Sequence, residues 1–297
     1  MRSFLPSDLP VPKLHGLLLG SVGPRPIAFA GTIDKAGRPN LAPFSFFNVF
    51  SANPPIMIFS PARRGRDNTT KHTYENALAV NEVTVNIVSY DMVHQMSLAS
   101  CEYPEGVNEY EKAGFTMQKS DLIAPWRVKE SPAQFECEII EVKPLGNQGG
   151  AGNLVICEVV KMHFADHIID DELRIDQEKI DTVGRMGGNW YTRAYGAALF
   201  EVPKPGAIPG IGFDALPDDI RTSKILTGND LGQLAAVHEL PDETEVNEWR
   251  LTELSDLFVE LEDEPAALEE SLHKSAANLL AENKVREAWL TLLTFNN

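Results

Sequence analysis

Cysteine is scarce in this chain of 297 residues, which has only Cys101, Cys137 and Cys157. Their number is odd and no two have CxxC spacing, so a disulfide framework and a structural zinc site are both disfavoured. We expect three buried, reduced thiols.

Long apolar runs are also missing. No stretch approaches the roughly 18 apolar residues of a membrane span. The first thirty residues lack the basic start, apolar middle and small-residue cleavage site of a secretory signal. We therefore expect a cytoplasmic protein that does not bind a membrane.

Basic residues are too few to balance the acidic ones, since 26 Lys and Arg face 43 Asp and Glu, a formal net charge of -17. The excess is concentrated at residues 204–297, where 7 basic and 19 acidic side chains leave a net charge of -12. Because such a charge repels polyanions at long range, we expect no nucleic-acid partner.

Several catalytic signatures are absent, including GxxxxGK[ST], GxSxG and HExxH. The glycine-rich GNQGGAG at 146–152 precedes strand-like sequence, and GRMGG at 184–188 lacks the spacing of a dinucleotide fingerprint. His163 and His167 are four residues apart in and just after a strand, where that spacing does not build the metal-binding face of a helix. We predict no metal site.

Strand-like sequence dominates the first two thirds of the chain. Residues 26–60 predict the strands PIAFAGTI, LAPFSFFNVF and PIMIFS, separated by the turns DKAGRPN and SANPP. VTVNIVS at 83–89 predicts another strand, and QFECEIIEVKPL and NLVICEVVKMHFA predict a long hairpin. Helices are predicted at 70–80, at YDMVHQMSLASC and at EYEKAGF. About six strands joined mostly by short turns favour a closed antiparallel barrel over a βαβ sheet.

The pattern changes near residue 203, where VPKPGAIPG predicts a linker. Beyond it, apolar residues recur at helical spacing and predict stripes that pack onto the barrel or a second subunit. These residues are Leu251, Leu254, Phe258, Leu261, Leu268, Leu272, Leu279, Val285, Ala288, Trp289 and Leu292. We predict two domains, a mainly β domain at 1–203 and an acidic, mostly α-helical extension at 204–297.

One short segment, SPARRGRDNTTKHT at 60–73, holds three arginines and a lysine within nine residues. It follows an apolar strand and runs into a helix that begins near Thr70. A helix N-terminus offers unpaired N–H groups, and arginines bind phosphate oxygens in pairs. The segment indicates a site for the phosphate of an organic cofactor, with a solvated basic loop as the alternative.

The strand LAPFSFFNVF at 41–50 mixes phenylalanines with Ser45 and Asn48. Aromatic surface together with polar donors suits a flat heteroaromatic ring, although a core strand with two tolerated polar residues is the alternative. Strand alternation predicts that one face carries Ser45, Phe47 and Val49 and the other carries Phe44, Phe46, Asn48 and Phe50.

Four segments resemble the flavin reductase-like FMN-binding split barrels, in particular their flavoredoxin-type members. They are GSVGPRPIAFAGTID, NLAPFSFFNVFSANPPIMIFSP, the RR…KHT loop and RMGGNWYTR, and they lie in the expected order within residues 11–203. The resemblance implies a mainly β, Greek-key split barrel with short helical inserts. It also implies non-covalent FMN at a homodimer interface.

By this resemblance, the isoalloxazine ring is lined by Ser45, Phe46 and Asn48. The phosphate is held by Ser60, Arg63, Arg64, Lys71 and Thr73. His163 corresponds to a histidine that lies near the flavin face in relatives. His72 departs from the pattern, because relatives commonly have Asp there, and it would add positive charge if it faces the phosphate.

The leading hypothesis is an oxidoreductase in which NAD(P)H, bound weakly, passes hydride to FMN, and the reduced flavin then serves an acceptor or a partner oxygenase. This step needs no catalytic acid–base pair. The second hypothesis is a non-catalytic electron carrier or FMN holder, whose acidic tail docks a basic redox partner or caps the active site. A third is a barrel that has lost flavin and only dimerises.

Overall fold

The computed structural model describes residues 1–204 and 206–295. The chain divides into two compact units, Met1–Phe200, called unit 1 below, and Glu201–Asn297, called unit 2. Within the described residues, no helix is long and apolar enough to span a bilayer.

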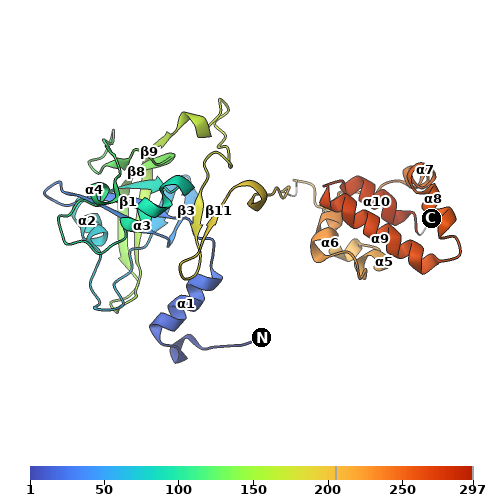
Figure 1. Ribbon diagram of the computed structural model, residues 1–297, viewed down its shortest axis with the longest axis horizontal. Coiled ribbons are helices and arrows are strands. Elements are labelled where there is room, and N and C mark those ends of the chain that lie inside the picture. Colours follow the sequence, from blue (N-terminus) through green and yellow to red (C-terminus); the bar gives the residue numbers. More distant parts are fainter. Residues whose placement is uncertain (205, 296–297) are drawn as a thin grey trace. The chain divides into compact units, whose positions relative to one another are not determined.

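Unit 1 is built on one seven-stranded sheet in which every pair of neighbours is antiparallel (Figure 1). The strand order is β2-β1-β5-β8-β9-β4-β3. The strands are β1 (Ala28–Ile33), β2 (Pro39–Phe44), β3 (Phe47–Ala52), β4 (Pro55–Phe59), β5 (Glu82–Ile87), β8 (Ala133–Pro144) and β9 (Asn153–Phe164). The predicted long hairpin is β8–β9.

Two small sheets and four α-helices complete unit 1. The small sheets pair β6 (Met117–Gln118) with β7 (Arg127–Val128) and β10 (Val183–Arg185) with β11 (Tyr191–Arg193). The helices are α1 (Val11–Ser21), α2 (His72–Val80), α3 (Val93–Leu98) and α4 (Glu109–Ala113). Gly114 ends α4 in the left-handed region, with φ of 73°, which glycine adopts without a Cβ clash.

The prediction of a closed barrel is wrong, because β2 and β3 form the two edges of the sheet and no ladder joins them among the described residues. The predicted single strand at 41–50 is also wrong, since it breaks between Phe44 and Phe47. The physical reason is that β2 pairs with β1 whereas β3 pairs with β4. These partners lie far apart in the strand order, so the chain has to bend between them.

The sheet is buried on both faces near β1, every residue of which is buried. Ala28 and Ala30 contribute to one apolar cluster with Phe59. Phe29 faces the other cluster, with Tyr110 and other residues from outside the sheet. Because successive residues of a strand point to opposite faces, a strand covered on both sides is apolar throughout rather than alternating.

The expectation of three buried thiols is wrong for Cys101, which is exposed, while Cys137 and Cys157 are buried. The hydrogen bond with Cys157 and burial both raise the pKa of the Cys137 thiol well above its ordinary value. Cys101 follows α3 in a segment without regular structure, where no strand carries it into the core.

Unit 2 is helical, and its six α-helices in the described residues are α5 (Asp218–Arg221), α6 (Gly228–Ala235), α7 (Glu243–Glu253), α8 (Ser255–Glu260), α9 (Pro265–Ala281) and α10 (Val285–Leu293). The predicted apolar stripes pack mainly against one another. Trp289 is buried and its indole N–H donates to the carbonyl of Leu234 at 3.0 Å. These helices thus form a core of their own, which the prediction of packing onto the barrel or a second subunit did not include.

Candidate functional site

Ser45 and Phe46 form the bend between β2 and β3. Arg25 Nε donates to Ser45 Oγ at 3.5 Å. The Phe46 carbonyl accepts from the backbone N–H of Ser60 at 2.9 Å, and the Phe46 side chain is 40% exposed. The bend therefore brings the segment predicted to line the ring directly beside the first residue of the basic segment.

The predicted alternation along 41–50 is wrong beyond this bend. Phe44 is buried and stacks on Phe59, with 5.5 Å between ring centroids, whereas Phe50 on the same predicted face is exposed. The bend resets the side-chain direction, and a register shift between Val49 and Ser51 leaves Phe50 outside the ladder. Asn48 is exposed, and its amide Nδ2 has no hydrogen-bond partner among the described residues.

Arg25 connects the Ser45–Phe46 bend to neighbouring segments of unit 1, although it is not among the predicted site residues. It is 6% exposed, and its Nη1 donates to the carbonyls of Leu19 at 2.7 Å and Val22 at 2.5 Å. Its Nη2 donates to the carbonyl of Met186 at 3.0 Å. The rigid guanidinium fork thus ties the end of α1, the RMGG turn and Ser45 to one point. The signal in the sequence is its place between two prolines in GPRPI.

Ser60 is held by the glycine-rich loop that connects β8 and β9. Its Oγ accepts from the backbone N–H of Asn153 at 3.0 Å, and the Asn153 amide donates to the carbonyl of Pro61 at 2.8 Å. A Cβ on Gly152 would lie 2.8 Å from Ser60 Oγ. The glycines of GNQGGAG therefore permit a close approach that supports the basic segment.

Arg63 braces the same segment from within. Its Nε and Nη2 donate to Oδ1 and the carbonyl of Asn68 at 2.7 and 2.6 Å. Its backbone N–H donates to the carbonyl of Ala151 at 2.8 Å, and its carbonyl accepts from Gly150 N–H at 3.0 Å. Arg63 is thus committed to the shape of the loop.

The remaining cations of the basic segment already hold an anion, the carboxylate of Glu102. Arg64 Nε lies 3.0 Å from Glu102 Oε1, Arg66 Nη2 lies 2.7 Å from Oε2, and Lys71 Nζ lies 3.8 Å from Oε1. Lys71 is the N-cap of α2 and makes no side-chain cap bond there. We call Arg64, Arg66 and Lys71 the cation cluster.

Electrostatics in the cation cluster are those of crowded positive charge. Burial and the neighbouring Arg64 lower the pKa of Lys71 below its ordinary value, and Glu102 opposes this shift. Hydrogen bonds from Arg66 and Arg64 lower the pKa of Glu102, and desolvation opposes this shift. An anion at this position relieves repulsion among the three cations.

Thr73 is the second residue of α2 and is 1% exposed. Its Oγ1 accepts from the Asn40 amide at 3.0 Å, which also donates to Thr32 Oγ1 at 3.2 Å. The contact fastens the start of α2 to the β1–β2 hairpin. Thr73 also borders a small cavity of about 40 Å³ together with Arg64, Lys71 and Glu102.

His163, on β9, is hydrogen-bonded to a different carboxylate. Its Nε2 lies 2.7 Å from Oε1 of Glu136 on β8, whose side chain is fully buried. No contact joins His163 to the cation cluster within the described residues. The structure therefore joins Phe46 to Ser60 and joins Arg64 to Lys71 through Glu102, while His163 belongs to a second polar network.

That second network, Asp121, Glu136 and His163, has ligand atoms within 4.8 Å of one another. The negative charges of Asp121 and Glu136 are paired with cationic side chains of the protein. Lys161 Nζ lies 2.6 Å from Asp121 Oδ2, and Arg127 Nε lies 3.6 Å from Glu136 Oε1. Three backbone N–H groups also bind Glu136, so its carboxylate is well supplied with donors. Arg127 Nε, which is buried, has no hydrogen-bond partner among the described residues.

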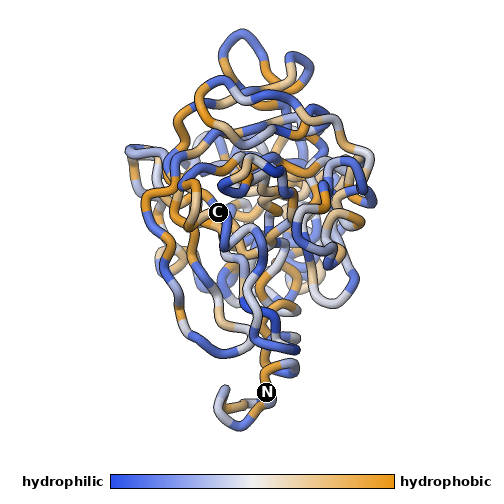
Figure 2. Tube along the Cα trace, turned by 90° about the vertical axis from the view of Figure 1, so that its left-hand side faces the viewer, coloured by the Kyte–Doolittle hydropathy of each residue, from blue (hydrophilic) through white to orange (hydrophobic). Residues whose placement is uncertain are grey.

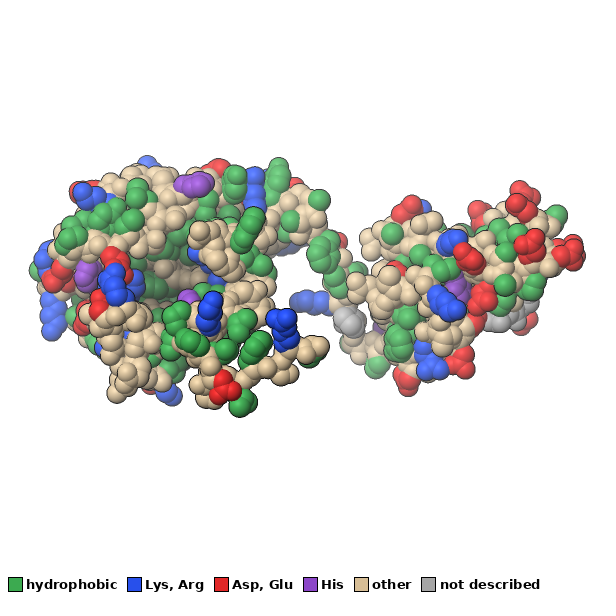
Figure 3. Space-filling model, turned by 60° about the horizontal axis from the view of Figure 1, so that its bottom comes forward, with side chains coloured by type: hydrophobic (Ala, Val, Ile, Leu, Met, Phe, Trp, Pro, Cys, Tyr) green, Lys and Arg blue, Asp and Glu red, His purple; other side chains and the backbone are tan. Residues whose placement is uncertain are grey.

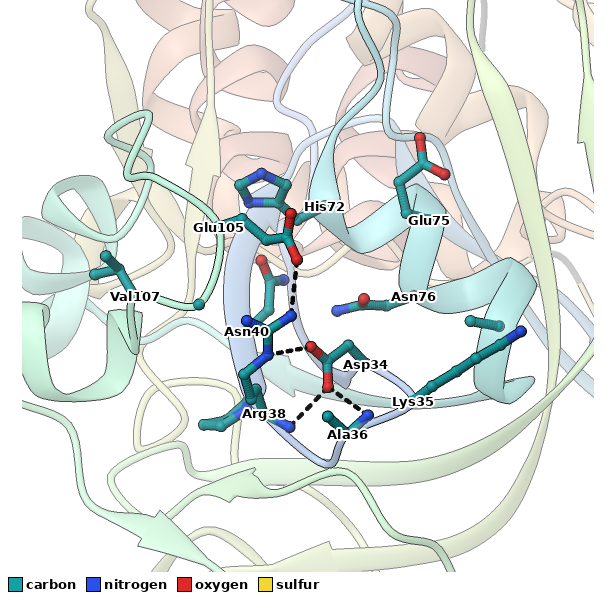
Figure 4. A pocket seen from close by; sticks show the side chains of 13 residues that line it. Asp34, Lys35, Ala36, Arg38, Asn40, His72, Glu75, Asn76, Glu105 and Val107 are labelled. Atoms are coloured by element: carbon teal, nitrogen blue, oxygen red, sulfur yellow. Dashed lines mark hydrogen bonds and ion pairs between the residues drawn. The ribbon is translucent and has the colours of Figure 1, made fainter.

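A cavity of about 460 Å³ lies between the 34–38 turn, α2 and the loop at 105–107. Figure 4 shows that Arg38 in this cavity contacts Asp34, and also Glu105 at 2.7 Å. His72, the first residue of α2, lines both this cavity and the small one beside Lys71. Figure 3 shows a separate view of unit 1, in which a hollow is bordered by hydrophobic, basic and acidic side chains.

The RMGGNWYTR segment contains the last residue of β10, the turn and β11, and it lines another cavity of about 410 Å³. Arg193 stacks over Tyr90 at 3.9 Å and pairs with Asp181 at 2.7 Å. Arg185 stacks over Tyr191 at 4.5 Å. These guanidinium–aromatic stacks hold the segment against the start of α3.

Comparison with known proteins gives the family. Residues 20–184 match the Flavin reductase like domain, a range that covers the seven-stranded sheet and the basic segment and ends within β10. This chain belongs to the flavin reductase-like family.

Relatives of the flavin reductase-like family match about two thirds of this chain. An uncharacterized protein of Aquifex aeolicus is 38% identical over 189 residues, which are 64% of this chain and 94% of that protein. The crystal structure of nitrilotriacetate monooxygenase component B from Bacillus cereus has 32% identity and a TM-score of 0.64, covering 68% of this chain and 98% of that one.

A third relative, the 2-nitrobenzoate 2-nitroreductase of Pseudomonas fluorescens, has 28% identity and a TM-score of 0.61, covering 69% of this chain and 100% of its own. Family membership and these neighbours support a flavin-related oxidoreductase with a flavin cofactor. Because the matches account for nearly the whole of these relatives, unit 2 is about the length by which this chain exceeds them.

Proposed function

We propose that this protein binds FMN non-covalently and uses NAD(P)H to reduce it. The observation that carries the proposal is the Glu102 carboxylate, an anion held by Arg64, Arg66 and Lys71. The donor set fits a phosphate monoester, which carries more negative charge and more acceptor oxygens than a carboxylate.

The energies are sufficient for a bound cofactor. Charge-assisted hydrogen bonds contribute about 1.5–3 kcal/mol each, and micromolar affinity corresponds to about 8 kcal/mol. Three such bonds supply much of this affinity, and contacts with the ring supply the rest. The phosphate therefore anchors the cofactor, and the ring contacts tune its properties.

The proposal assigns the candidate site residues to phosphate binding, to support of the loop and α2, or to contact with the ring. Arg64 and Lys71 bind the phosphate directly together with Ser60, and Arg63 and Thr73 keep the loop and α2 in place. A separate group faces the ring, and it consists of Ser45, Phe46 and Asn48. Arg25 positions this group through Ser45.

When bound, flavin would accept a hydride from NAD(P)H, which leaves as NAD(P)⁺. The hydride carries two electrons and a proton. The protein keeps Phe46 accessible at the bend and leaves the Asn48 amide free to donate. No nucleotide fingerprint is present in the sequence. NAD(P)H therefore binds weakly, mainly by stacking.

The test is rapid mixing of the FMN-loaded protein with NADH and with NADPH. Loss of the oxidised flavin absorption with either one supports the proposal, and no loss with both refutes the reductase. Equilibrium titration tests whether the phosphate is bound by Arg64. Arg64→Ala is expected to weaken FMN binding by about 1.5–3 kcal/mol while riboflavin binding stays unchanged. Arg38→Ala, which removes an exposed arginine away from the corner, is the matched control. Equal losses for both flavins with Arg64→Ala would make the cation cluster structural.

A homodimer is part of the same proposal, because one surface of unit 1 is apolar and includes a sheet edge. β3 is an edge strand whose exposed residues include Val49 and Phe50. α1 adds Leu17 and Leu18, and it has no buried residue of its own. Figure 2 shows hydrophobic residues among hydrophilic ones along this N-terminal segment. An exposed apolar edge favours pairing, and a monomer in sedimentation equilibrium would refute the dimer.

A second candidate function is that of an electron carrier reduced by a partner protein, and the observation that favours it is the charge of unit 2. Residues 204–297 carry 7 basic and 19 acidic side chains, a surface suited to a basic redox partner or oxygenase. FMN-loaded protein that neither nicotinamide reduces, but that a partner reduces with steep salt dependence, would favour this function.

A further inference from the structure

Glu102 lies outside the segment that supplies the cations it contacts. It follows α3, 38 residues after Arg64 in the chain, and both of its carboxylate oxygens are engaged, Oε1 by Arg64 and Oε2 by Arg66. A carboxylate placed between three cations occupies the position where an anionic ligand would bind. The cation cluster is therefore neutralised in part by the protein itself.

The segment that carries Glu102 can leave without breaking regular structure. Residues 99–108 contain no helix or strand, and the Glu102 backbone makes no hydrogen bond among the described residues. Its side chain is 42% exposed, whereas that of Arg64 is 16% exposed. The carboxylate is thus the more mobile partner, and Arg64 remains fixed through its bonds to Thr69 and the Thr70 carbonyl.

We propose that Glu102 is a competing counter-ion, which a phosphate monoester must displace in order to enter the cation cluster. The proposal rests on the proposed function in one respect, that the phosphate of interest belongs to FMN. Glu102 then determines how strongly the site selects phosphorylated over unphosphorylated flavin.

The thermodynamic consequence is specific to anions. Any ligand that takes the place of Glu102 loses the free energy of the Glu102 ion pairs, so its apparent affinity is reduced by that amount. A ligand without a phosphate leaves Glu102 in place and loses nothing. Because exposed ion pairs are individually weak, three of them correspond to about a tenfold reduction, or ~1.4 kcal/mol.

The experiment compares wild-type protein with Glu102→Gln, which removes the charge and keeps the size of the side chain. Glu105→Gln is the matched control, because Glu105 lies in the same segment and pairs with Arg38 outside the cation cluster. Each full-length protein is titrated calorimetrically with inorganic phosphate, FMN and riboflavin. Glu102→Gln is expected to bind phosphate and FMN about tenfold more tightly than wild type and riboflavin within twofold of wild type, whereas Glu105→Gln should match wild type for all three.

Several results would overturn the proposal. These are equal phosphate and FMN affinities in wild type and Glu102→Gln, weaker binding by Glu102→Gln, an equal gain for riboflavin, or no phosphate binding by either protein. Tighter phosphate binding without any flavin binding would support the role of Glu102 and refute the FMN proposal. Should Glu102→Gln lack the wild-type circular dichroism spectrum, Glu102→Ala and Glu102→Asp provide the comparison. Alanine should reproduce the gain, and aspartate should give less of it.

Discussion

Oε1 of Glu136 lies 2.7 Å from Nε2 of His163, and the Glu136 side chain is completely buried. The same carboxylate accepts backbone N–H groups of Asp121 at 2.9 Å and Leu122 at 2.7 Å. Burial raises the pKa of Glu136, but these N–H groups and His163 together hold it below its ordinary value of 4.5. One ionised carboxylate thus joins β8, β9 and the loop that starts near residue 120.

Glu136→Gln is expected to lower the free energy of unfolding by about 1–3 kcal/mol at pH 7. Because the folded-state pKa of Glu136 is depressed, its contribution is fully present above pH 4.5 and is lost as pH falls through the lower folded value. The difference between wild type and Glu136→Gln should therefore shrink below pH 4.5. Urea unfolding across this range measures it, with Glu138→Gln on the exposed side of β8 as control. A difference that is independent of pH would contradict the assignment.

Arg25→Lys keeps the positive charge but should break the contacts by which Arg25 links the end of α1, the RMGG turn and Ser45. Lysine cannot reach the carbonyls of Leu19, Val22 and Met186 together, so we expect a loss of about 2 kcal/mol or more in unfolding free energy. Binding of FMN and of riboflavin should weaken by the same factor, because the proposed function places Ser45 at the ring and not at the phosphate. Fluorescence titration of both flavins checks this, with exposed Arg38→Lys as control. A loss confined to FMN would place Arg25 at the phosphate instead.

Gly152→Ala should displace Ser60, a proposed phosphate-binding residue, without changing any charge. The added methyl group would lie 2.8 Å from Ser60 Oγ, which must then leave its hydrogen bond with Asn153 N–H. We expect FMN binding to weaken by about 1 kcal/mol and riboflavin binding to change less. Gly16→Ala in α1 is the control, because its methyl group meets no atom within 4 Å. Unchanged FMN affinity in Gly152→Ala would remove Ser60 from the site.

Cutting the chain after Phe200 should leave two folded pieces. Unit 1 has its own two apolar clusters and unit 2 has two others, including the cluster around Trp289. Residues 1–200 should keep their strand spectrum and bind FMN as the whole chain does, and residues 201–297 should be helical. Circular dichroism and FMN titration of the separate pieces test this. An unfolded residue 1–200 fragment would show that unit 2 is required for folding.

Much of the fold was accessible from local patterns. The β-branched and aromatic runs at 26–33, 83–89, 134–145 and 153–165 became strands, because strand formation there is encoded within a few neighbouring residues. The break at Ser45–Phe46 was not predicted, since it arises from pairing with β1 on one side and β4 on the other. That choice of partners depends on residues far away in the chain.

The candidate site divides in the same way. Four cations within nine residues can be seen in the sequence, whereas the carboxylate that three of them hold is contributed by Glu102, in another segment. The role of Arg25 could not be predicted from a charge pattern in the sequence, because its guanidinium binds backbone carbonyls of α1 and the RMGG turn. His163 was assigned by resemblance, and its contact with Glu136 depends on the β8–β9 register.

By itself, the sequence determined that the chain has a strand-rich part with a concentrated basic segment and an acidic helical part, because composition and periodicity act over short distances. Tertiary structure alone decided that β2 and β3 end as separate edges, that Arg25 reaches Ser45, and that Glu102 lies among Arg64, Arg66 and Lys71. Those outcomes depend on burying apolar faces together, a constraint on the whole chain that no local stretch contains.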